Sequence, residues 1–289
     1  MKLSIIIVSW KVKDFLYKCL FSIKEHIPAS ISFEVILVDN NSADGTVEMV
    51  KTEFPWVRLI ASKENLGFAR GNNLAFEQAT GEYFFLLNPD TQLKEFAIER
   101  LLSFMDKNVD IAAVGPKLLN TDGSLQPSCK AFPKVSTLIF QALFLDKIFP
   151  KSKTFGSYEM SWWDHSDTRE VDQPMGAALL VRKKVVDTIG PMDENFYMFF
   201  DEVDWCYRMK KLGYKIFFLD NAEIFHHGGR SIKSAELRMS YHWHKSLKNF
   251  FKKHYHLPGW FVNLLIVSLF VFKILIGVLI IKYFISNFV

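Results

Sequence analysis

The first 115 residues alternate between short apolar runs and segments whose apolar residues recur at helical spacing. The apolar runs are rich in β-branched and aromatic residues, and they occupy residues 3–8, 33–38, 57–61, 83–87 and 111–114. Helical spacing marks residues 14–25, 44–53, 66–79 and 94–105. Buried strands separated by helices are typical of a parallel sheet with right-handed crossovers. The sequence therefore predicts an α/β fold with helices flanking a mostly parallel sheet.

The pattern changes after residue 115. Residues 116–170 carry scattered Pro, Gly and aromatic residues, and they predict a hairpin, a helix over 136–145 and a mobile loop over 151–167. Strand character returns at residues 171–181. Two helices are predicted over 183–189 and 198–212, and a last strand over 215–219.

The C-terminal part is strongly apolar. Residues 261–281 contain one charge, Lys273, and about 20 apolar residues suffice to span a bilayer as a helix. Lys273 would raise the free energy of inserting this helix into a bilayer by about 2.5–3.5 kcal/mol. The lysines at 245, 248, 252 and 253 favour a cytoplasmic location for the preceding domain. The alternatives are a buried amphipathic helix and two short interfacial segments broken at Lys273. We expect a membrane-associating helical segment and a membrane-associated protein.

The net charge, the cysteine positions and the N-terminal sequence argue against several other classes of protein. The net charge is +4 and dispersed, so a nucleic-acid partner is not expected. Cys19, Cys129 and Cys206 are far apart, which predicts reduced thiols. The N-terminal apolar run is too short for a membrane span and has no small-residue cleavage site, so no signal peptide is predicted.

Two predicted strands end in acids. Asp39 begins the cluster D-N-N-S, where it and Asn41 are placed to hydrogen-bond a nucleoside base or ribose, unless the cluster is only an Asx turn. Residues 84–91 read FFLLNPDT, and Pro89 ends the strand. Asp90 therefore lies where open α/β sheets bind ligands, or else caps the next helix. Neither G-x-G-x-x-G nor a P-loop occurs, which argues against dinucleotide binding and P-loop chemistry.

The segment NLGFARGNN offers further polar groups. It starts at Asn65, and Gly67 permits a turn whose N–H groups face an anion at the helix start. Arg70 can add charge to a phosphate, and Asn72 or Asn73 can hydrogen-bond a polar ligand edge. The alternative is an ordinary helix N-terminus with a solvent-facing Arg70.

Asp90 is also a candidate metal ligand. Mg²⁺ or Mn²⁺ is commonly held by one or two carboxylates together with phosphate oxygens and water. His226 and His227 follow the last predicted strand and are candidate further ligands, or surface histidines before a Gly turn. Arg230 follows them and is a candidate substrate contact.

The densest acid cluster is D-E-V-D after an aromatic run. On a helix, Asp201 and Asp204 share a face and Glu202 points elsewhere. A carboxylate beside aromatic walls can have a raised pKa, which suits removal of a hydroxyl proton. The alternative is a set of helix-start acids favoured by the macrodipole.

Taken in order, these segments resemble glycosyltransferase family 2, of the rhamnosyltransferase-like kind. The resemblance covers residues 1 to about 235 and rests on seven ordered segments: SIIIVSW, VDNNSADGT, NLGFARGNN, FFLLNPDT, MGAALLVRK, MDENFYMFFDEVDWCYRMKKLGY and FHHGGRS. It implies a GT-A, Rossmann-like fold, a nucleotide-diphosphate sugar donor, a divalent metal and inversion at the anomeric carbon.

The resemblance also implies residue roles. Asp39 would contact the base, and Asp90 would be the retained acid of the D-x-D motif, in which Asn88 replaces the first acid. Glu202 would be the catalytic base, with Asp201 as its rival. Residues lining the donor–acceptor boundary would be Met175, Gly176 and Ala177.

The expected function is therefore transfer of a sugar to a glycan or lipid-linked acceptor in cell-surface polysaccharide synthesis. The alternatives are a catalytically impaired nucleotide-sugar-binding or scaffold protein, favoured by Asn88, and a nucleotidyltransferase. The expected organisation is a catalytic domain over 1–235, a basic and aromatic helical linker over 236–258, and a membrane helix over 259–283.

Overall fold

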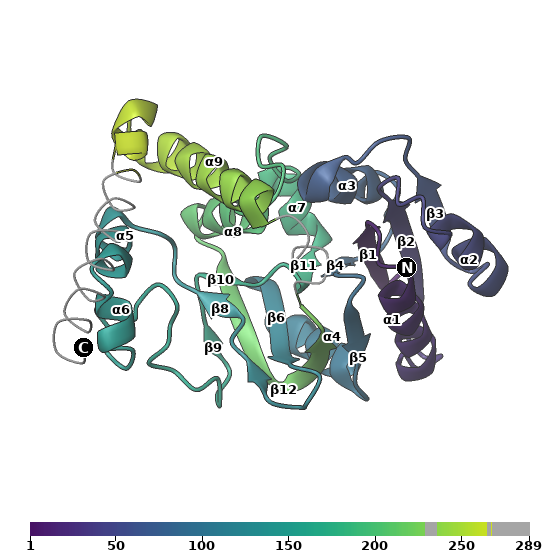
Figure 1. The fold of residues 1–289 in the computed structure, drawn as a ribbon. Helices are drawn as coiled ribbons and strands as arrows, with labels where there is room; N and C mark the ends of the chain where they lie inside the picture. Colours follow the sequence, from purple (N-terminus) through teal and green to yellow (C-terminus); the bar gives the residue numbers. More distant parts are fainter. Residues whose placement is uncertain (229–235, 265–266, 268–289) are drawn as a thin grey trace, which may run out of the picture.

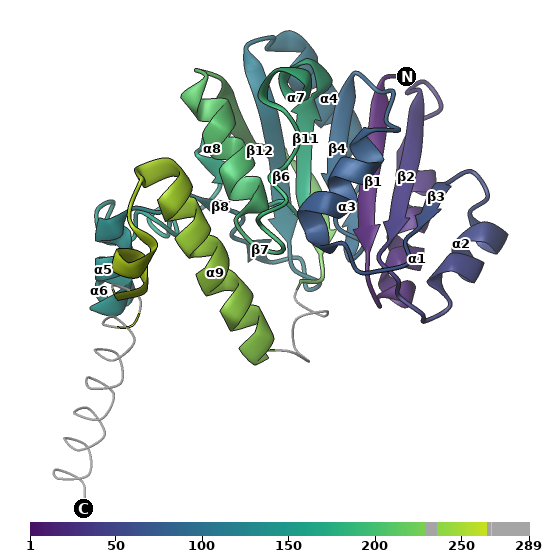
Figure 2. The ribbon, with the colours of Figure 1, turned by 90° about the horizontal axis from the view of Figure 1, so that it is seen from above.

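The protein is built around one large sheet with helices on both faces (Figures 1 and 2). The computed structural model describes residues 1–228, 236–264 and 267 of the 289. Successive residues of β1 point to opposite faces, so that Ile6 joins one core cluster while Ile5 and Ile7 join the other. The strands predicted at residues 3–8, 33–38 and 83–87 are thus largely buried on both faces, whereas the strand predicted at 57–61 is partly exposed.

The sheet is mixed. Its main strands run in the order β3-β2-β1-β4-β11-β6-β12-β5. Their bounds are β1 Leu3–Ser9, β2 Phe33–Asp39, β3 Arg58–Ala61, β4 Tyr83–Leu87, β5 Thr91–Leu93, β6 Ile111–Leu119, β11 Ala178–Arg182 and β12 Lys215–His226. Four shorter strands are β7 Leu125–Gln126, β8 Cys129–Lys130, β9 Arg169–Glu170 and β10 Gln173–Pro174. The α/β class is confirmed, and β11 departs from the expected parallel order because it runs antiparallel between β4 and β6.

The helices divide between the two faces. One core cluster takes residues from α1 Lys13–His26, α2 Thr46–Glu53 and α4 Ala97–Lys107. The other takes residues from α3 Gly67–Phe76, α7 Lys183–Ile189, α8 Asp201–Lys211 and α9 Glu236–Tyr255. Two short helices, α5 Val135–Ala142 and α6 Leu145–Ile148, lie beyond the β8 side of the sheet (Figure 1).

Three expected elements have different bounds. The strand expected over 171–181 is interrupted between β10 and β11. The helix expected over 198–212 starts at Asp201, because Phe199 and Phe200 adopt left-handed φ values of 64° and 63°. The last strand does not stop at Leu219. It continues through an irregularity before Glu223 and ends at His226.

The C-terminal part is described only in places. α9 packs into the main core, where Leu247, Phe250 and Phe251 are almost fully buried. Within residues 1–228, 236–264 and 267, no helix is long and apolar enough to cross a bilayer. Most of the membrane segment expected over 259–283, including Lys273, lies outside the described residues.

A buried acid joins α8 to α9. The Asp204 carboxylate is fully buried and lies 2.9 Å from Arg208 Nε, 2.7 Å from Lys253 Nζ and 2.6 Å from His254 Nε2. Burial by itself raises the pKa of Asp204. The hydrogen bonds from His254 and Lys253 and the charge of Arg208 outweigh burial, so that the pKa lies below its usual 3.8.

Replacing Asp204 with Asn should therefore destabilise the fold at neutral pH by about 3 kcal/mol, because it removes the charge of a fully buried carboxylate that pairs with the partly buried Arg208 and with Lys253. A carboxylate whose pKa is lowered in the folded state adds stability at pH values above its unfolded-state pKa. That stability is lost as the pH falls through the folded-state pKa. The difference from the wild-type chain should therefore shrink below pH 3.8. Urea unfolding at pH 7 and pH 3 measures this. Asp187→Asn, in an exposed pair with Lys183, is the control and should change stability by less than about 0.5 kcal/mol. An equal effect of the two variants would contradict the prediction.

Candidate active site

The carboxyl ends of β1 and β2 carry two buried oxygens without partners. Asp39 is paired in register with Ser9, and their exposed fractions are 2% and 0%. Asp39 Oδ2 accepts a hydrogen bond from the Ser42 N–H, whereas Asp39 Oδ1 and Ser9 Oγ have no partner among the described residues. Buried oxygens of this kind are costly unless a ligand or water satisfies them. The site can therefore accept an N–H or O–H group of a ligand.

The start of α3 is fixed against this edge. The Asn40 side chain donates to the Gly67 carbonyl at 3.0 Å and accepts from the Leu66 N–H at 3.4 Å. Asn65 Oδ1 accepts from the Gly67 N–H, so Asn65 acts as a turn residue. Gly67 has φ +77°, and a Cβ there would lie 2.5 Å from the Tyr197 carbonyl oxygen. Only glycine lets these two loops approach so closely.

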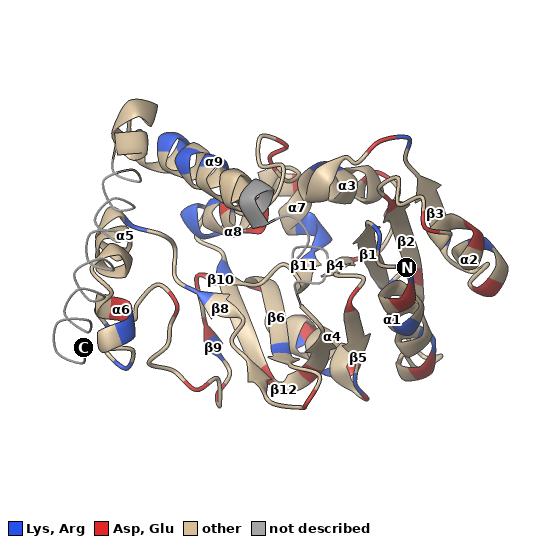
Figure 3. Ribbon diagram, viewed as in Figure 1, with Lys and Arg blue, Asp and Glu red and all other residues tan. Residues whose placement is uncertain are grey.

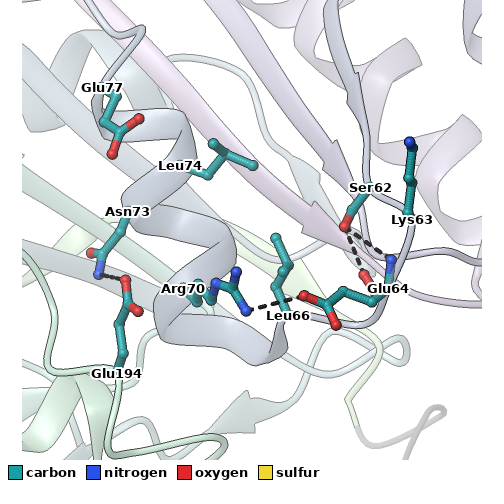
Figure 4. A pocket seen from close by; sticks show the side chains of 9 residues that line it. All are labelled: Ser62, Lys63, Glu64, Leu66, Arg70, Asn73, Leu74, Glu77 and Glu194. Carbon is teal, nitrogen blue, oxygen red and sulfur yellow. Dashed lines mark hydrogen bonds and ion pairs between the residues drawn. The ribbon is translucent and has the colours of Figure 1, made fainter.

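The other polar residues predicted around α3 have different surroundings. Asn41 is exposed, with φ 58°. Asn72 is buried, and its side-chain amide donates to the Phe68 carbonyl. Arg70 pairs with Glu64 at 3.1 Å and lines an open groove of about 600 Å³ (Figure 4). An exposed ion pair of this kind is weak, so Arg70 is available to an anionic ligand.

Asn73, the alternative to Asn72 as a ligand contact, ties α3 to the segment after α7. Its side-chain amide donates to the Met192 carbonyl at 2.9 Å and to Glu194 at 3.0 Å, and its oxygen accepts from the Met192 N–H. Figure 4 shows Asn73 pointing toward Glu194, away from the Arg70–Glu64 pair. Asn73 therefore has a structural role.

The pairing of β12 with β5 brings His226 to Asp90. His226 is paired with Thr91 in register, and its Nε2 lies 3.4 Å from Asp90 Oδ1. Both side chains are largely buried. The His227 N–H donates to the Asp90 carbonyl, while the His227 ring contacts Gln92 Oε1 at 2.8 Å through its Nε2. Asp90 and His226 therefore face each other, and the His227 ring is directed to Gln92.

Gln126 orients the His226 ring. Its amide nitrogen donates to Asn120 Oδ1 and to the His226 carbonyl, which fixes the amide so that its oxygen faces His226 Nδ1 at 2.7 Å. We therefore assign the hydrogen to Nδ1, and a neutral His226 presents the lone pair of Nε2 toward Asp90. Two acceptors that face each other in this way suit a cation between them.

The Asp90–His226 pair offers a divalent cation two protein ligands. In the part of the chain that the structure describes, no three His, Cys, Asp or Glu side chains gather to hold a metal. Asp90 and His226 supply one oxygen and one nitrogen. Mg²⁺ or Mn²⁺ commonly takes its remaining ligands from phosphate and water, so this pair is compatible with either ion.

Residues 175–177 join the Asp90 side of the site to the acid cluster. The Asn88 N–H donates to the Ala177 carbonyl at 2.8 Å, and the Met175 N–H donates to the Ser128 carbonyl. A Cβ on Gly176 would lie 3.3 Å from Glu202 Cβ, so Glu202 packs directly against this loop. Because Gly176 has no side chain, Glu202 can pack closely against this loop.

Asp201 and Glu202 occupy different environments at the start of α8. Asp201 is 2% exposed, and its Oδ1 accepts from the Glu202 N–H while its Oδ2 has no partner among the described residues. Burial, reinforced by the neighbouring Glu202 carboxylate, raises the pKa of Asp201 well above its usual value. Glu202 is half-buried. The pair therefore favours a neutral Asp201 beside a Glu202 that remains accessible.

One predicted substrate contact, Asp204, is not part of this arrangement. Asp204 directs its carboxylate to Arg208, Lys253 and His254, so both of its oxygens are already engaged. Arg230 lies outside the described residues. Gln126 was not predicted, because it lies in a segment without a distinguishing motif. Ser9 and Asn40 lie in the segments SIIIVSW and VDNNSADGT, but neither residue was predicted to have a role of its own.

The chain is similar to known proteins in both sequence and fold. Residues 4–164 match the family described as glycosyl transferase family 2. Over 208 residues, 68% of this chain and 67% of the relative, it is 28% identical to the N-acetylglucosaminyl-diphospho-decaprenol L-rhamnosyltransferase of Mycobacterium tuberculosis. It is 24% identical to the low-salt glycan biosynthesis hexosyltransferase Agl10 of Haloferax volcanii, over 72% of this chain and 62% of that protein.

Two solved structures share the fold. GalNAc-T7 with UDP, GalNAc and Mn²⁺ superposes with a TM-score of 0.58 at 14% identity, covering 78% of this chain and 44% of that one. TarS of S. aureus (residues 1–349) with UDP-GlcNAc gives 0.53 at 19% identity, covering 78% and 58%. At these identities the likeness is one of fold, and it supports the predicted GT-A architecture.

The close approach at Gly67 predicts a measurable cost for alanine. Gly67→Ala should destabilise the fold by about 1–2 kcal/mol through its positive φ, and by about 1–3 kcal/mol more because its Cβ meets the Tyr197 carbonyl. Gly123→Ala is the matched control, since Gly123 has φ +82° and nothing within 4 Å of an added Cβ. The difference between the two variants in the free energy of unfolding in urea measures the steric cost of the contact with Tyr197. Equal losses would show that the contact with Tyr197 is not important.

Proposed function

Because the chain belongs to glycosyl transferase family 2 and is a glycosyltransferase, we propose that it moves a sugar from a nucleoside-diphosphate donor to an acceptor hydroxyl with inversion. The observation that carries this proposal is the alignment of three groups along one edge of the sheet. The unpartnered Asp39 oxygen, the Asp90–His226 pair and Glu202 against Gly176 follow one another there.

The known relatives support a lipid-linked acceptor and a nucleotide-sugar donor. The mycobacterial relative is named for transfer of L-rhamnose to a diphospho-decaprenol-linked sugar, and the TarS structure contains UDP-GlcNAc. We propose that this chain uses a donor and an acceptor of these two classes, in polysaccharide synthesis at a membrane. Rhamnose is a candidate donor sugar.

The donor would lie across the ends of β1, β2 and β4. Asp39 Oδ1 and Ser9 Oγ would accept hydrogen bonds from the base or ribose, which would satisfy oxygens that the described residues leave without partners. Arg70 would lie near the phosphates and add positive charge there. Asn65, Gly67 and Asn40 would hold the start of α3 in position.

The diphosphate would lie at Asp90 and His226. A bound Mg²⁺ or Mn²⁺ would neutralise charge that develops on the leaving diphosphate. Asp90 and His226 would hold this ion, and Gln126 would keep the His226 ring oriented toward it. Asn88 carries no charge, and its backbone N–H instead holds the Ala177 carbonyl.

The acceptor hydroxyl would be activated by Glu202. This carboxylate is accessible and packs beside Gly176, next to the loop that reaches Asn88. Glu202 would take the hydroxyl proton as the oxygen attacks the anomeric carbon from the face opposite the diphosphate. The Asp201 carboxyl is buried behind Glu202, so it is not open to an acceptor hydroxyl. Its raised pKa would limit the negative charge that accumulates at the site.

Glu202→Gln should lower kcat by about 10²–10⁴-fold while donor affinity stays within about twofold, because the amide cannot accept the proton. Asp201→Asn keeps the size of a buried side chain that is not open to the acceptor, so it should retain activity to within about tenfold. Release of nucleoside diphosphate from a panel of donors in the presence of acceptor measures the rate, and calorimetry measures donor binding. A Glu202→Gln enzyme with nearly normal kcat would exclude Glu202 as the base.

Gln126→Leu should weaken Mn²⁺ binding by about 10–100-fold, since His226 would lose the partner that fixes its ring. Gln92→Leu, which removes the partner of His227 instead, is the matched control and should have little effect. Electron paramagnetic resonance of Mn²⁺ titrated with nucleoside diphosphate present measures binding without turnover. Equal losses in the Gln126 and Gln92 leucine variants would contradict the assignment.

A further inference from the structure

The α5–α6 hairpin has an exposed apolar face. Ile139 on α5 and Leu143, the residue after the helix, lie four positions apart, and each is 38% exposed. Ile148 at the end of α6 is 62% exposed, and the adjacent Phe149 is 50% exposed. Large apolar side chains that gather on a small surface, rather than occurring singly, indicate an interaction site.

The same hairpin is basic on its outside. The exposed charged residues within 134–154 are all lysines, namely Lys134, Lys147, Lys151 and Lys153. The segment contains one acid, Asp146, which is 9% exposed. Figure 3 shows positive charge on α6 and along α9, at the same end of the molecule.

The hairpin is held firmly from beneath. Leu138 and Ala142 are buried, and the Phe155 ring packs on Phe140 and Phe149 at centroid distances of 5.1 Å and 5.6 Å. The exposed apolar side chains are therefore presented by a packed support, so their exposure is a property of the folded chain.

A second apolar surface lies beside it. The Tyr255 hydroxyl donates to the Pro133 carbonyl at 3.0 Å, which fixes the end of α9 next to the start of α5. In the turn that follows, Trp260 is 69% exposed and Leu264 is 59% exposed. Figures 1 and 2 both place this turn and the hairpin at one end of the molecule.

We propose that the α5–α6 hairpin is a membrane-docking surface, with its four apolar side chains in the interface of a bilayer and its lysines on anionic headgroups. Apolar side chains surrounded by lysines, with no exposed acid, match the surface of an anionic membrane in both polarity and charge. A second copy of this chain would bring the same lysines together, so charge disfavours that occupant.

The hairpin is also connected to the catalytic edge. Its root strand β8 pairs with β10, and the Met175 N–H donates to the Ser128 carbonyl, immediately before Gly176. If the proposed function holds, docking at the hairpin would bring Glu202 near a lipid-linked acceptor. Membrane binding itself requires neither the donor nor turnover, so the two proposals are tested separately.

The first experiment reports on the hairpin itself, because apolar residues elsewhere in the full chain can also bind vesicles. The three native cysteines are buried, so Ile148→Cys can be labelled selectively with an environment-sensitive fluorophore. The label should shift to the blue with vesicles of phosphatidylglycerol and phosphatidylcholine, and much less with phosphatidylcholine alone. Val109→Cys, at a residue that is 79% exposed before β6, is the control and should not shift.

Two outcomes would overturn the proposal. One is co-sedimentation of the protein with anionic vesicles while the label at residue 148 stays unshifted, which would assign binding to the C-terminal part alone. The other is a shift that needs no vesicles and grows with protein concentration, which would assign the face to a second copy.

The second experiment tests the charge. Lys147→Glu/Lys151→Glu/Lys153→Glu should weaken binding to anionic vesicles at least tenfold and leave donor hydrolysis unchanged. The matched control, Lys24→Glu/Lys51→Glu/Lys107→Glu, makes the same change in net charge at exposed lysines of α1, α2 and α4. If both triple variants bind equally, the hairpin lysines are not the contact and the proposal fails.

Discussion

The register of β1 between β2 and β4 is the constraint on which the candidate site depends. Parallel pairing makes the three strands end at one edge, with Ser9 directly opposite Asp39. The strands are buried on both faces, so their apolar residues fix this register strongly. Any polar side chain that directly follows them is brought to the same edge, whatever its separation in the chain.

The second half of the chain completes this edge with antiparallel pairings. β11 inserts between β4 and β6, which places residues 175–177 beside Asn88. β12 reaches back to β5 and delivers His226 to Asp90, although 136 residues separate them in the sequence. The acid cluster then comes from α8, held against α9 through Asp204. Each proposed site residue is thus fixed by a pairing or a packing contact outside its own motif.

Much of this was predictable from local pattern. The apolar runs of β1, β2 and β4 and the polar residues that follow them gave the fold class, and the ordered motifs gave the family that the comparisons confirm. Residues 175–177 were less predictable, because Gly176 breaks a run that otherwise reads as one strand. The left-handed Phe199 and Phe200 were also not predictable, because aromatic residues rarely adopt that conformation.

Contacts between distant residues were beyond the sequence patterns. The continuation of β12 past Leu219 depends on an irregularity at residues 220–222, which look like a turn when read alone. Gln126 carries no motif, and only the fold shows that its amide faces His226. Asp204 appeared equivalent to Asp201 by helical spacing, yet one is compensated by three cationic or imidazole groups and the other is not.

Asn88 stands where the resemblance to the D-x-D motif leads us to expect an acid. Acids at both positions 88 and 90 would supply a cation site with two carboxylates from one short segment after β4. Here the second ligand would come from β12, and the amide of Gln126 would set its orientation. An imidazole adds a nitrogen ligand without adding negative charge, so the diphosphate of the donor would contribute more of the charge that holds the ion. A site of this kind would bind the ion tightly only when the donor is present.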